Sequence, residues 1–265
     1  MINTGERYIR EENGLGITIE HIHRYKSILD VVKDKVVLDI ACGTGYGTKI
    51  ISEVAREVYG VDISFESIEY AKLTYCAPNI KFIQGSVESI PLEDNSIDVV
   101  ISYETIEHVD SDAQNNFISE VNRVLKKNGI LIISTPNKYK YSDIKKYNNP
   151  YHKKEFYKEE FLKFISQNFK YYNLYDQRFD IVSSIKKADN RYQKNNKINS
   201  LKILEDNKED GLYFIILASN CILNHDFSNI IMGIQDQYYK FYNMDRIISL
   251  FDKIKSRLYI DLGEG

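Results

Sequence analysis

The chain has 265 residues, a formal net charge of −3, 43% hydrophobic residues and 28% charged residues. This balance is typical of a globular protein and excludes collagen-like, coiled-coil and wholly disordered chains. A general nucleic-acid binder usually carries a clear basic excess, so we expect nucleic acid not to be the main partner. The cysteines, Cys42, Cys76 and Cys221, form no C-x-x-C pair, which argues against a disulfide framework and a cysteine-based zinc site.

The sequence contains no recognisable targeting or membrane segment. The longest uncharged apolar run, residues 212–218, is far shorter than the roughly 20 residues that a spanning helix needs. The first residues, MINTGERYIREENG, are polar and mixed in charge, unlike a secretion signal. We therefore expect a cytoplasmic protein with no membrane span.

Between residues 36 and 134, short β-branched runs alternate with amphipathic segments, which is the pattern of βαβ units around a parallel sheet. Ser64 is suited to cap a helix through Thr74. Lys126 and Lys127 are expected in the last turn of a later helix, with Asn128-Gly129 as its C-cap. The predicted strands are 36–40, 58–63, 80–85, 97–102 and 130–134, and the predicted helices are 46–55, 64–74 and 113–127.

After residue 136 the pattern is less regular. It predicts a loop rich in Lys and Tyr over 137–158, a helix over 159–168, strands over 169–175 and 212–219, and a helix over 229–258. The apolar face of Ile247–Ile254 could pack on its own core or on a second copy in a homodimer. The expected divisions are an N-terminal helical cap at 1–33, a core at 34–136, a basic and aromatic loop and helix at 137–168, the last sheet strands at 169–219 with a polar insertion at 186–210, and a C-terminal helical tail at 220–265.

A glycine-rich turn follows the first strand. Its pattern is G-x-G-x-G, and Thr48 stands where a dinucleotide site would have its third glycine. Asp39, four residues before the first glycine, suits a ligand with a positive charge. Asp62 ends the second strand, where a carboxylate can accept both hydroxyls of a ribose. Together these residues favour an adenosine-bearing, zwitterionic ligand over a dinucleotide.

The ordered motifs VLDIACGTGYG, VYGVDIS, IKFIQGSVESIPL and ILIISTPN resemble those of the class I S-adenosylmethionine (SAM)-dependent methyltransferases. The resemblance covers about residues 34–137. It implies SAM as cofactor and a Rossmann-like α/β fold: a seven-stranded doubly wound sheet, mostly parallel with an antiparallel last strand, and helices on both faces.

The same resemblance implies where the cofactor lies. The glycine turn and Asp39 would hold its methionine part, Asp62 its ribose, and Ile63 and the Val87 amide its adenine. The family commonly has Asp where Ser86 stands, and serine is a weaker acceptor for the adenine amino group. The implied cofactor-binding set is Asp39, Ala41, Gly43, Gly45, Asp62, Ile63, Ser86, Val87, Glu88 and Tyr103.

Two histidines are candidates for the general base that a hydroxyl acceptor needs. In a helical turn after the fourth strand, Glu104, Glu107 and His108 would share one face. His152 lies in NPYHKKEF, which resembles the N-P-F-H-x-x-E-F stretch of glycan and sugar methyltransferases, as Glu20–Tyr25 resembles their E-H-x-x-R-Y helix. The catalytic candidates are His108, His152 and Glu107; a polar cluster that only shapes the cofactor pocket, and a His152 without a role, remain alternatives.

The same side chains also suggest a metal site. The E-x-x-E-H piece followed by a distant His resembles the divalent-metal site of small-RNA 2′-O-methyltransferases, and the piece also occurs in ubiquinone-pathway O-methyltransferases. Two carboxylates and two imidazoles suit Mg²⁺ or Mn²⁺. The predicted ligands are Glu104, Glu107, His108 and His152.

Lysines and tyrosines alternate in the loop at 137–158. They could form a cationic, aromatic rim for a phosphorylated sugar, a nucleotide sugar or a single nucleic-acid strand. The alternative, slightly favoured, is a solvated face that reflects a composition rich in Tyr and Lys throughout.

The sequence thus favours a SAM-dependent methyltransferase that acts on a hydroxyl, or less readily an amine, of a sugar, nucleotide sugar or other small polar acceptor. Two alternatives stay open: a metal-dependent RNA ribose 2′-O-methyltransferase and a catalytically silent SAM-binding subunit. A nicotinamide oxidoreductase is disfavoured by Thr48.

Overall fold

The computed structural model describes residues 15–178 and 211–226. The predicted insertion at 186–210, the predicted helix at 229–258 and its apolar face lie outside these residues. No helix of the described part is both long and apolar enough to cross a membrane. The helices are α1 (Leu15–Ser27), α2 (Leu29–Val32), α3 (Tyr46–Ser52), α4 (Phe65–Thr74), α5 (Ser111–Val124) and α6 (Lys158–Ser166), with a 3₁₀ turn η1 (Ile106–His108) and a π turn η2 (Tyr139–Asp143).

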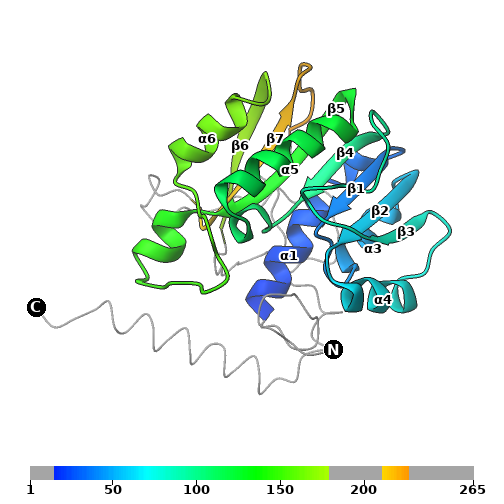
Figure 1. The fold of residues 1–265 in the computed structure, drawn as a ribbon, viewed down its shortest axis with the longest axis horizontal. Coiled ribbons are helices and arrows are strands. Elements are labelled where there is room, and N and C mark those ends of the chain that lie inside the picture. Colours follow the sequence, from blue (N-terminus) through cyan, green and yellow to red (C-terminus); the bar gives the residue numbers. More distant parts are fainter. Residues whose placement is uncertain (1–14, 179–210, 227–265) are drawn as a thin grey trace, which may run out of the picture.

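Seven strands form one sheet in the order β3-β2-β1-β4-β5-β7-β6. Figure 1 shows them side by side, with β3 at one edge and β6 at the other. β7 is antiparallel to both of its neighbours, and the other pairs are parallel. The predicted seven-stranded, mostly parallel sheet is confirmed. The strands are β1 (Val36–Ile40), β2 (Glu57–Asp62), β3 (Ile80–Gln84), β4 (Ile97–Ser102), β5 (Leu125–Pro136), β6 (Tyr171–Gln177) and β7 (Tyr213–Ser219).

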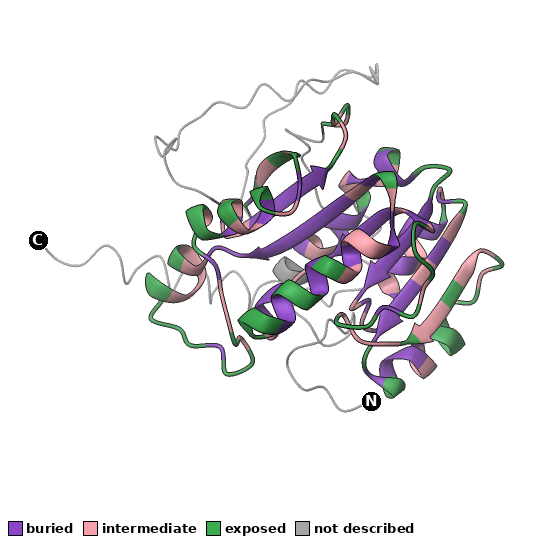
Figure 2. Ribbon diagram, turned by 45° about the horizontal axis from the view of Figure 1, so that its top comes forward, coloured by how far each residue is buried: buried purple, intermediate pink, exposed green. Residues whose placement is uncertain are grey.

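Alternating side chains of the central strands pack into two separate cores. Leu38 of β1 faces the core that contains Phe117 of α5 and Phe161 of α6. Val37 faces the opposite core, which contains Tyr25 of α1 and Ile51 of α3. Figure 2 shows the result as buried strands between helices whose outer faces are exposed. The apolar runs on both faces of β1 and β4 are therefore explained by helices on both sides.

The predicted end of the helix at 113–127 is wrong. α5 ends at Val124, and Leu125 is already extended, at φ −66° and ψ 135°. Leu125 pairs with Ile97 of β4, and Lys126 Nζ lies 2.8 Å from Asp98 Oδ1. Lys126 and Lys127 therefore belong to β5, and Asn128-Gly129 caps no helix. A nonlocal strand pairing overrides a local C-cap signal here.

The region after β5 differs in detail from the prediction. The expected loop contains η2, and Asn137 bridges to Phe156 before α6 begins. β6 begins two residues later than the expected strand at 169–175. α3 ends three residues before the expected end at Ala55. These are shifts of boundaries, and the order of elements is as predicted.

Candidate functional site

The strand order reverses between β1 and β4, because β2 lies on one side of β1 and β4 on the other. In open α/β sheets, ligands bind beyond the carboxyl ends of the strands at such a switch point. The loops after β1, β2 and β4 all meet at this edge. The glycine turn, Asp62 and His108 are therefore brought to one place by topology.

The glycine turn reverses the chain through the left-handed region. Gly43 and Gly45 have φ of +54° and +84°, and Ala41 between them and β1 has φ of +59°. Glycine adopts this conformation freely, whereas alanine does so at a cost. A Cβ on Gly43 would meet no atom within 4 Å, so bare backbone borders open space there. This is the geometry that a ligand approaching the peptide requires.

Asp62 is held rigidly at the end of β2. Its Oδ2 accepts a hydrogen bond of 2.9 Å from the Gly43 amide, and its Oδ1 accepts one of 2.9 Å from the Ser64 amide. The next residue, Ile63, is 70% exposed. A fixed carboxylate beside an exposed apolar side chain fits the ribose and adenine of a nucleoside, so the residues present fit the implied cofactor.

Asp39 lies beneath the turn rather than on its surface. It is 1% exposed, and its carboxylate accepts hydrogen bonds from the Tyr25 hydroxyl at 3.1 Å and the Thr48 hydroxyl at 2.6 Å. Burial raises the pKa of Asp39 to about 7. The charge of Asp39 is thus not presented directly to a ligand here, and its predicted contact with the methionine part stays a prediction.

Gly47 and Tyr103 both contact the Tyr25 ring of α1. The ring of Tyr25 lies where a Cβ on Gly47 would stand. The same ring packs edge-on against Tyr103 at a centroid distance of 5.0 Å, and the Tyr103 hydroxyl donates to the Arg24 carbonyl at 3.3 Å. In the described residues Tyr103 therefore supports α1, and its predicted contact with the cofactor stays a prediction.

The turn after β3 carries the residues predicted to meet the adenine edge. Ser86 Oγ accepts a hydrogen bond from the Glu88 amide at 3.2 Å, and the exposed Glu88 carboxylate accepts one from Asn116 Nδ2 at 3.1 Å. Val87 packs against the α5 core. The turn is thus ordered by its own contacts, and the adenine contact itself remains a prediction.

Glu107 and His108 lie in η1, directly after β4. Glu107 is fully buried; its Oε2 accepts from the Thr135 hydroxyl at 3.0 Å, and its Oε1 lies 4.0 Å from His108 Nε2. Oε1 has no hydrogen bond within the described part of the chain. Burial, and secondarily the negative charge of Glu104, raise the pKa of Glu107 well above its usual range.

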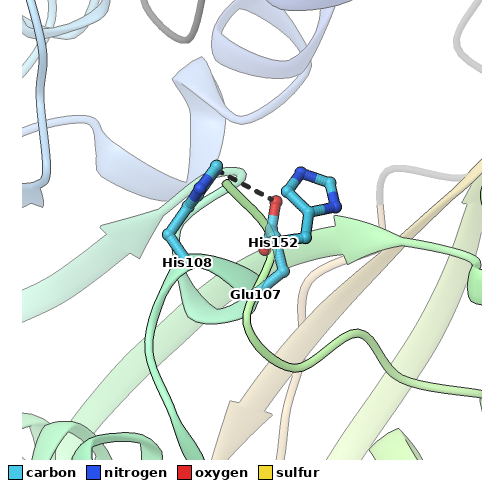
Figure 3. Close-up of side chains that lie close together, drawn as sticks. All are labelled: Glu107, His108 and His152. Atoms are coloured by element: carbon cyan, nitrogen blue, oxygen red, sulfur yellow. Dashed lines mark ion pairs between the residues drawn. The ribbon is translucent and has the colours of Figure 1, made fainter. Parts of the chain in front are cut away.

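His152 reaches the same place from the segment after β5. One ring nitrogen of His108, one of His152 and one oxygen of Glu107 lie within 4.8 Å of one another. Figure 3 shows the three side chains close together. The imidazole rings of His108 and His152 meet edge to face at a centroid distance of 4.9 Å. An unpartnered carboxylate oxygen beside two imidazoles fits a divalent cation, and it equally fits a site that removes a proton.

Glu104 does not belong to this cluster. It precedes η1 with φ of +51°, so Glu104, Glu107 and His108 do not share a helical face as predicted. Its Oε1 accepts a 2.6 Å hydrogen bond from the Ser134 hydroxyl and lies 3.5 Å from Arg24 Nη1. Of the four predicted metal ligands, the structure therefore brings together Glu107, His108 and His152 only.

Arg24, within the Glu20–Tyr25 stretch, is a buried cation beside the site. Its side chain is 1% exposed, its Nε donates to Gln177 Oε1 at 2.6 Å, and its guanidinium lies 4.3 Å from the centre of the Tyr213 ring. Through Glu104 it ties α1 to the end of β4. The E-H-x-x-R-Y stretch was the available signal, but a buried arginine cannot be told from an exposed one in sequence.

The lysines and tyrosines of the 137–158 segment partly satisfy one another. Lys138 Nζ lies 4.8 Å from the ring centre of Tyr157, and Lys145 Nζ lies 5.6 Å from that of Tyr141. The Tyr157 hydroxyl donates to Asp143 at 2.9 Å. Much of the segment nevertheless stays exposed, and its contact with an acceptor stays a prediction.

Comparisons with known proteins find similarity to methyltransferases. Residues 38–133 match the methyltransferase domain family Methyltransf_11. A protein of Mycolicibacterium smegmatis named as a probable S-adenosylmethionine-dependent methyltransferase is 35% identical over 156 residues, which are 57% of this chain and 58% of that protein. The ubiquinone/menaquinone biosynthesis C-methyltransferase UbiE of Campylobacter jejuni is 36% identical over 109 residues, or 38% of this chain and 44% of that protein.

A solved SAM-dependent methyltransferase from Archaeoglobus fulgidus has the same fold, with a TM-score of 0.57, 20% identity, and coverage of 79% of this chain and 96% of that chain. The match spans about three fifths of the length of the Mycolicibacterium smegmatis relative and about two fifths of that of UbiE. Within that span, residues 38–133 are similar to methyltransferase domains of SAM-dependent enzymes.

Proposed function

We propose that this chain is a class I SAM-dependent methyltransferase that methylates a hydroxyl of a sugar, nucleotide sugar or other small polar acceptor. The observation that carries the proposal is the cluster of Glu107, His108 and His152 beyond the carboxyl ends of β4 and β5, beside the cofactor edge. A hydroxyl must lose its proton to become a good nucleophile, and an imidazole near neutral pH is the side chain suited to accept it.

The chain's own residues would bind and orient the cofactor. Asp62, fixed by the Gly43 and Ser64 amides, would accept the ribose hydroxyls, and Ile63 would lie against the adenine. The open backbone at Gly43 would admit the methionine part. SAM, when bound, supplies a methyl group on a positively charged sulfur that leaves as a neutral thioether.

Glu107 would support the histidines. One oxygen of its buried carboxyl group lies 4.0 Å from His108 Nε2, close enough to help orient that ring. His108 or His152 would take the acceptor's proton as the oxygen attacks. The residues of the site would also have to align the acceptor oxygen with the methyl group. No covalent enzyme intermediate is needed, because the positively charged sulfur is already a good leaving group.

The sugar class of acceptor rests on the 149–156 segment. Its NPYHKKEF sequence resembles a stretch of sugar and glycan methyltransferases, and its histidine is the one that the structure brings to His108. The matched relatives include a C-methyltransferase, UbiE, so relatedness alone does not select an oxygen acceptor. We also propose a cytoplasmic location.

A panel of acceptors tests the proposal. The full chain is incubated with labelled SAM and free sugars, sugar phosphates, nucleotide sugars, an amino sugar and a quinol. We expect label in a hydroxyl acceptor, and a loss of about 10²–10⁴-fold in rate for His152→Asn or His108→Asn. His225→Asn is the matched control and should keep the full rate. His225 follows β7, which ends toward the amino-terminal end of β5, away from the carboxyl ends of the parallel strands. Label found only on carbon or nitrogen would refute the hydroxyl assignment.

A second candidate is a metal-assisted reaction, favoured by the unpartnered Oε1 of Glu107 between two imidazoles. Glu107, His108 and His152 would hold Mg²⁺ or Mn²⁺, and the ion would lower the pKa of an acceptor hydroxyl. Titration of the chain with Mn²⁺ decides this: binding lost in Glu107→Gln supports it, and unchanged binding opposes it.

Two broader alternatives are tested by the same preparation. An RNA ribose 2′-O-methyltransferase would bind single-stranded RNA with a steep salt dependence. A catalytically silent SAM-binding subunit would bind the cofactor without turning it over on any acceptor.

A further inference from the structure

His152 is paired with a carboxylate of its own segment. Its Nδ1 lies 2.5 Å from Glu155 Oε1, and the two side chains are only 6% and 9% exposed. The His-x-x-Glu spacing places them together in the irregular stretch before α6. A hydrogen bond this short between nearly buried groups fixes the imidazole in its plane.

The π turn η2 holds this pair from a second side. The Ser142 hydroxyl is shared between both oxygens of Glu155, at 2.8 and 2.6 Å. Tyr141, one residue earlier, stacks on the His152 ring at a centroid distance of 5.4 Å and an interplanar angle of 24°. The carboxylate is thus itself oriented, and the plane of the imidazole is set independently of it.

The segment is also anchored to η1. The amides of Lys153 and Lys154 both donate to the Glu107 carbonyl, at 2.8 and 3.1 Å. The His152 amide donates to the Asn149 carbonyl at 3.2 Å. The backbone around His152 therefore has little freedom to reorient the ring, so the ring's hydrogen bonds decide which nitrogen carries the proton.

We infer that Glu155, supported by Ser142, is a positioning residue that keeps the proton of neutral His152 on Nδ1 and leaves the lone pair on Nε2. A carboxylate can only accept, so the nitrogen that faces it must be the protonated one. Within the described residues, the hydrogen bond found for the His152 ring is the one at Nδ1. The other ionisable groups around the ring are Glu107 and His108 of η1 and Tyr141 of η2.

This inference rests on the proposed function and names the atom that takes the proton of the acceptor hydroxyl. The O–H bond of the acceptor breaks, and its proton moves to Nε2 of His152. The oxygen lone pair forms the new bond to the methyl carbon, and the electron pair of the methyl–sulfur bond stays on sulfur. His152 then carries protons on both nitrogens, with Glu155 stabilising the added charge, and returns one to water.

Nitrogen-15 spectroscopy of the histidine-labelled full chain tests the inference without any acceptor. At about pH 9, well above the ordinary histidine pKa of about 6.5, the shifts of Nδ1 and Nε2 report the tautomer directly. His152→Asn assigns the signal. We expect the Nδ1–H form in the wild type and in Glu155→Gln, whose amide oxygen still accepts. We expect a shift toward Nε2–H in Glu155→Ala. Glu159→Ala, an exposed acid at the start of α6, is the matched control and should not move it.

A kinetic arm uses a hydroxyl acceptor identified in the panel. Glu155→Ala should lower kcat by about 10- to 100-fold with little change in acceptor KM, and Glu155→Gln should recover part of the loss. If Glu155→Ala does not fold, Ser142→Ala should give a smaller tautomer shift in the same direction. An Nε2–H wild type, or a tautomer that neither variant moves, overturns the inference. If no hydroxyl acceptor turns over while the tautomer shifts as expected, the proposed function fails and the positioning role stands.

Discussion

Gly47→Ala perturbs the contact that joins α1 to the glycine turn. Gly47 lies in α3, where alanine is ordinarily the better residue by about 0.5–1 kcal/mol. A Cβ at this position, however, would fall well under 3.0 Å from Cζ and both Cε atoms of the Tyr25 ring, closer than real Cβ contacts come. The ring cannot give way freely, because it is 5% exposed and packs against Tyr46 and Tyr103.

The expected magnitude follows from these contacts. Forcing an extra carbon into a packed core costs about 1–3 kcal/mol. Moving the ring also disturbs the hydrogen bond from the Tyr25 hydroxyl to Asp39, worth about 1 kcal/mol. After the helix gain is subtracted, Gly47→Ala should lower the free energy of unfolding by about 1–3 kcal/mol.

Urea unfolding followed by far-ultraviolet circular dichroism measures this change, and a double-mutant cycle isolates its cause. In a Tyr25→Ala background the overlap is gone, so Gly47→Ala should become neutral or stabilising by up to about 1 kcal/mol. The refuting result is a loss of stability from Gly47→Ala that is the same in both backgrounds. Gly47 would then be required for some reason other than the space that it leaves for the Tyr25 ring.

Three further outcomes follow from the site. Burial raises the folded-state pKa of Asp39 from 3.8 to about 7, so the stability that the protonated group contributes is present below about pH 4 and is lost as pH rises toward 7. Urea unfolding at each pH should therefore show that the difference in unfolding free energy between wild type and Asp39→Asn falls by at most about 4 kcal/mol over that range. A difference that does not change with pH would contradict the burial argument. Ala41→Gly should raise the free energy of unfolding by about 0.5–1 kcal/mol, because φ of +59° strains alanine, and a thermal melt showing lower stability would contradict this. Asp62→Ala should weaken S-adenosylhomocysteine binding by about 1–3 kcal/mol in calorimetry through unpaired ribose hydroxyls, whereas an unchanged dissociation constant would remove Asp62 from the pocket.

The positions of the glycine turn and of Asp62 at the strand ends could be predicted from sequence because their determinants are local. Glycines at fixed spacing after a buried strand, and an acid at the end of the next strand, are ordered by the sheet itself. In the structure Asp62 also accepts a hydrogen bond from the Gly43 amide, a contact that the sequence did not predict. Ser64 caps α4 as predicted, accepting from the Ser67 amide.

The features that sequence could not supply depend on contacts across the fold. The end of α5 was misplaced because Leu125 pairs with Ile97, a partner far away in the chain. Glu104 was grouped with Glu107 by spacing, yet its positive φ turns it to Ser134 and Arg24. Asp39 belongs to a recognisable motif, but it is buried and accepts hydrogen bonds from the hydroxyls of Tyr25 and Thr48. The motif does not predict these contacts.

We propose above all that the carboxyl edge at the β1–β4 switch point binds a sulfonium nucleoside. Calorimetric titration of the full chain with S-adenosylmethionine, S-adenosylhomocysteine and NADH tests it most directly. We expect saturable one-site binding of the first two, mutual competition between them, and no heat from the third. Binding of NADH with no heat from either adenosyl compound would contradict it.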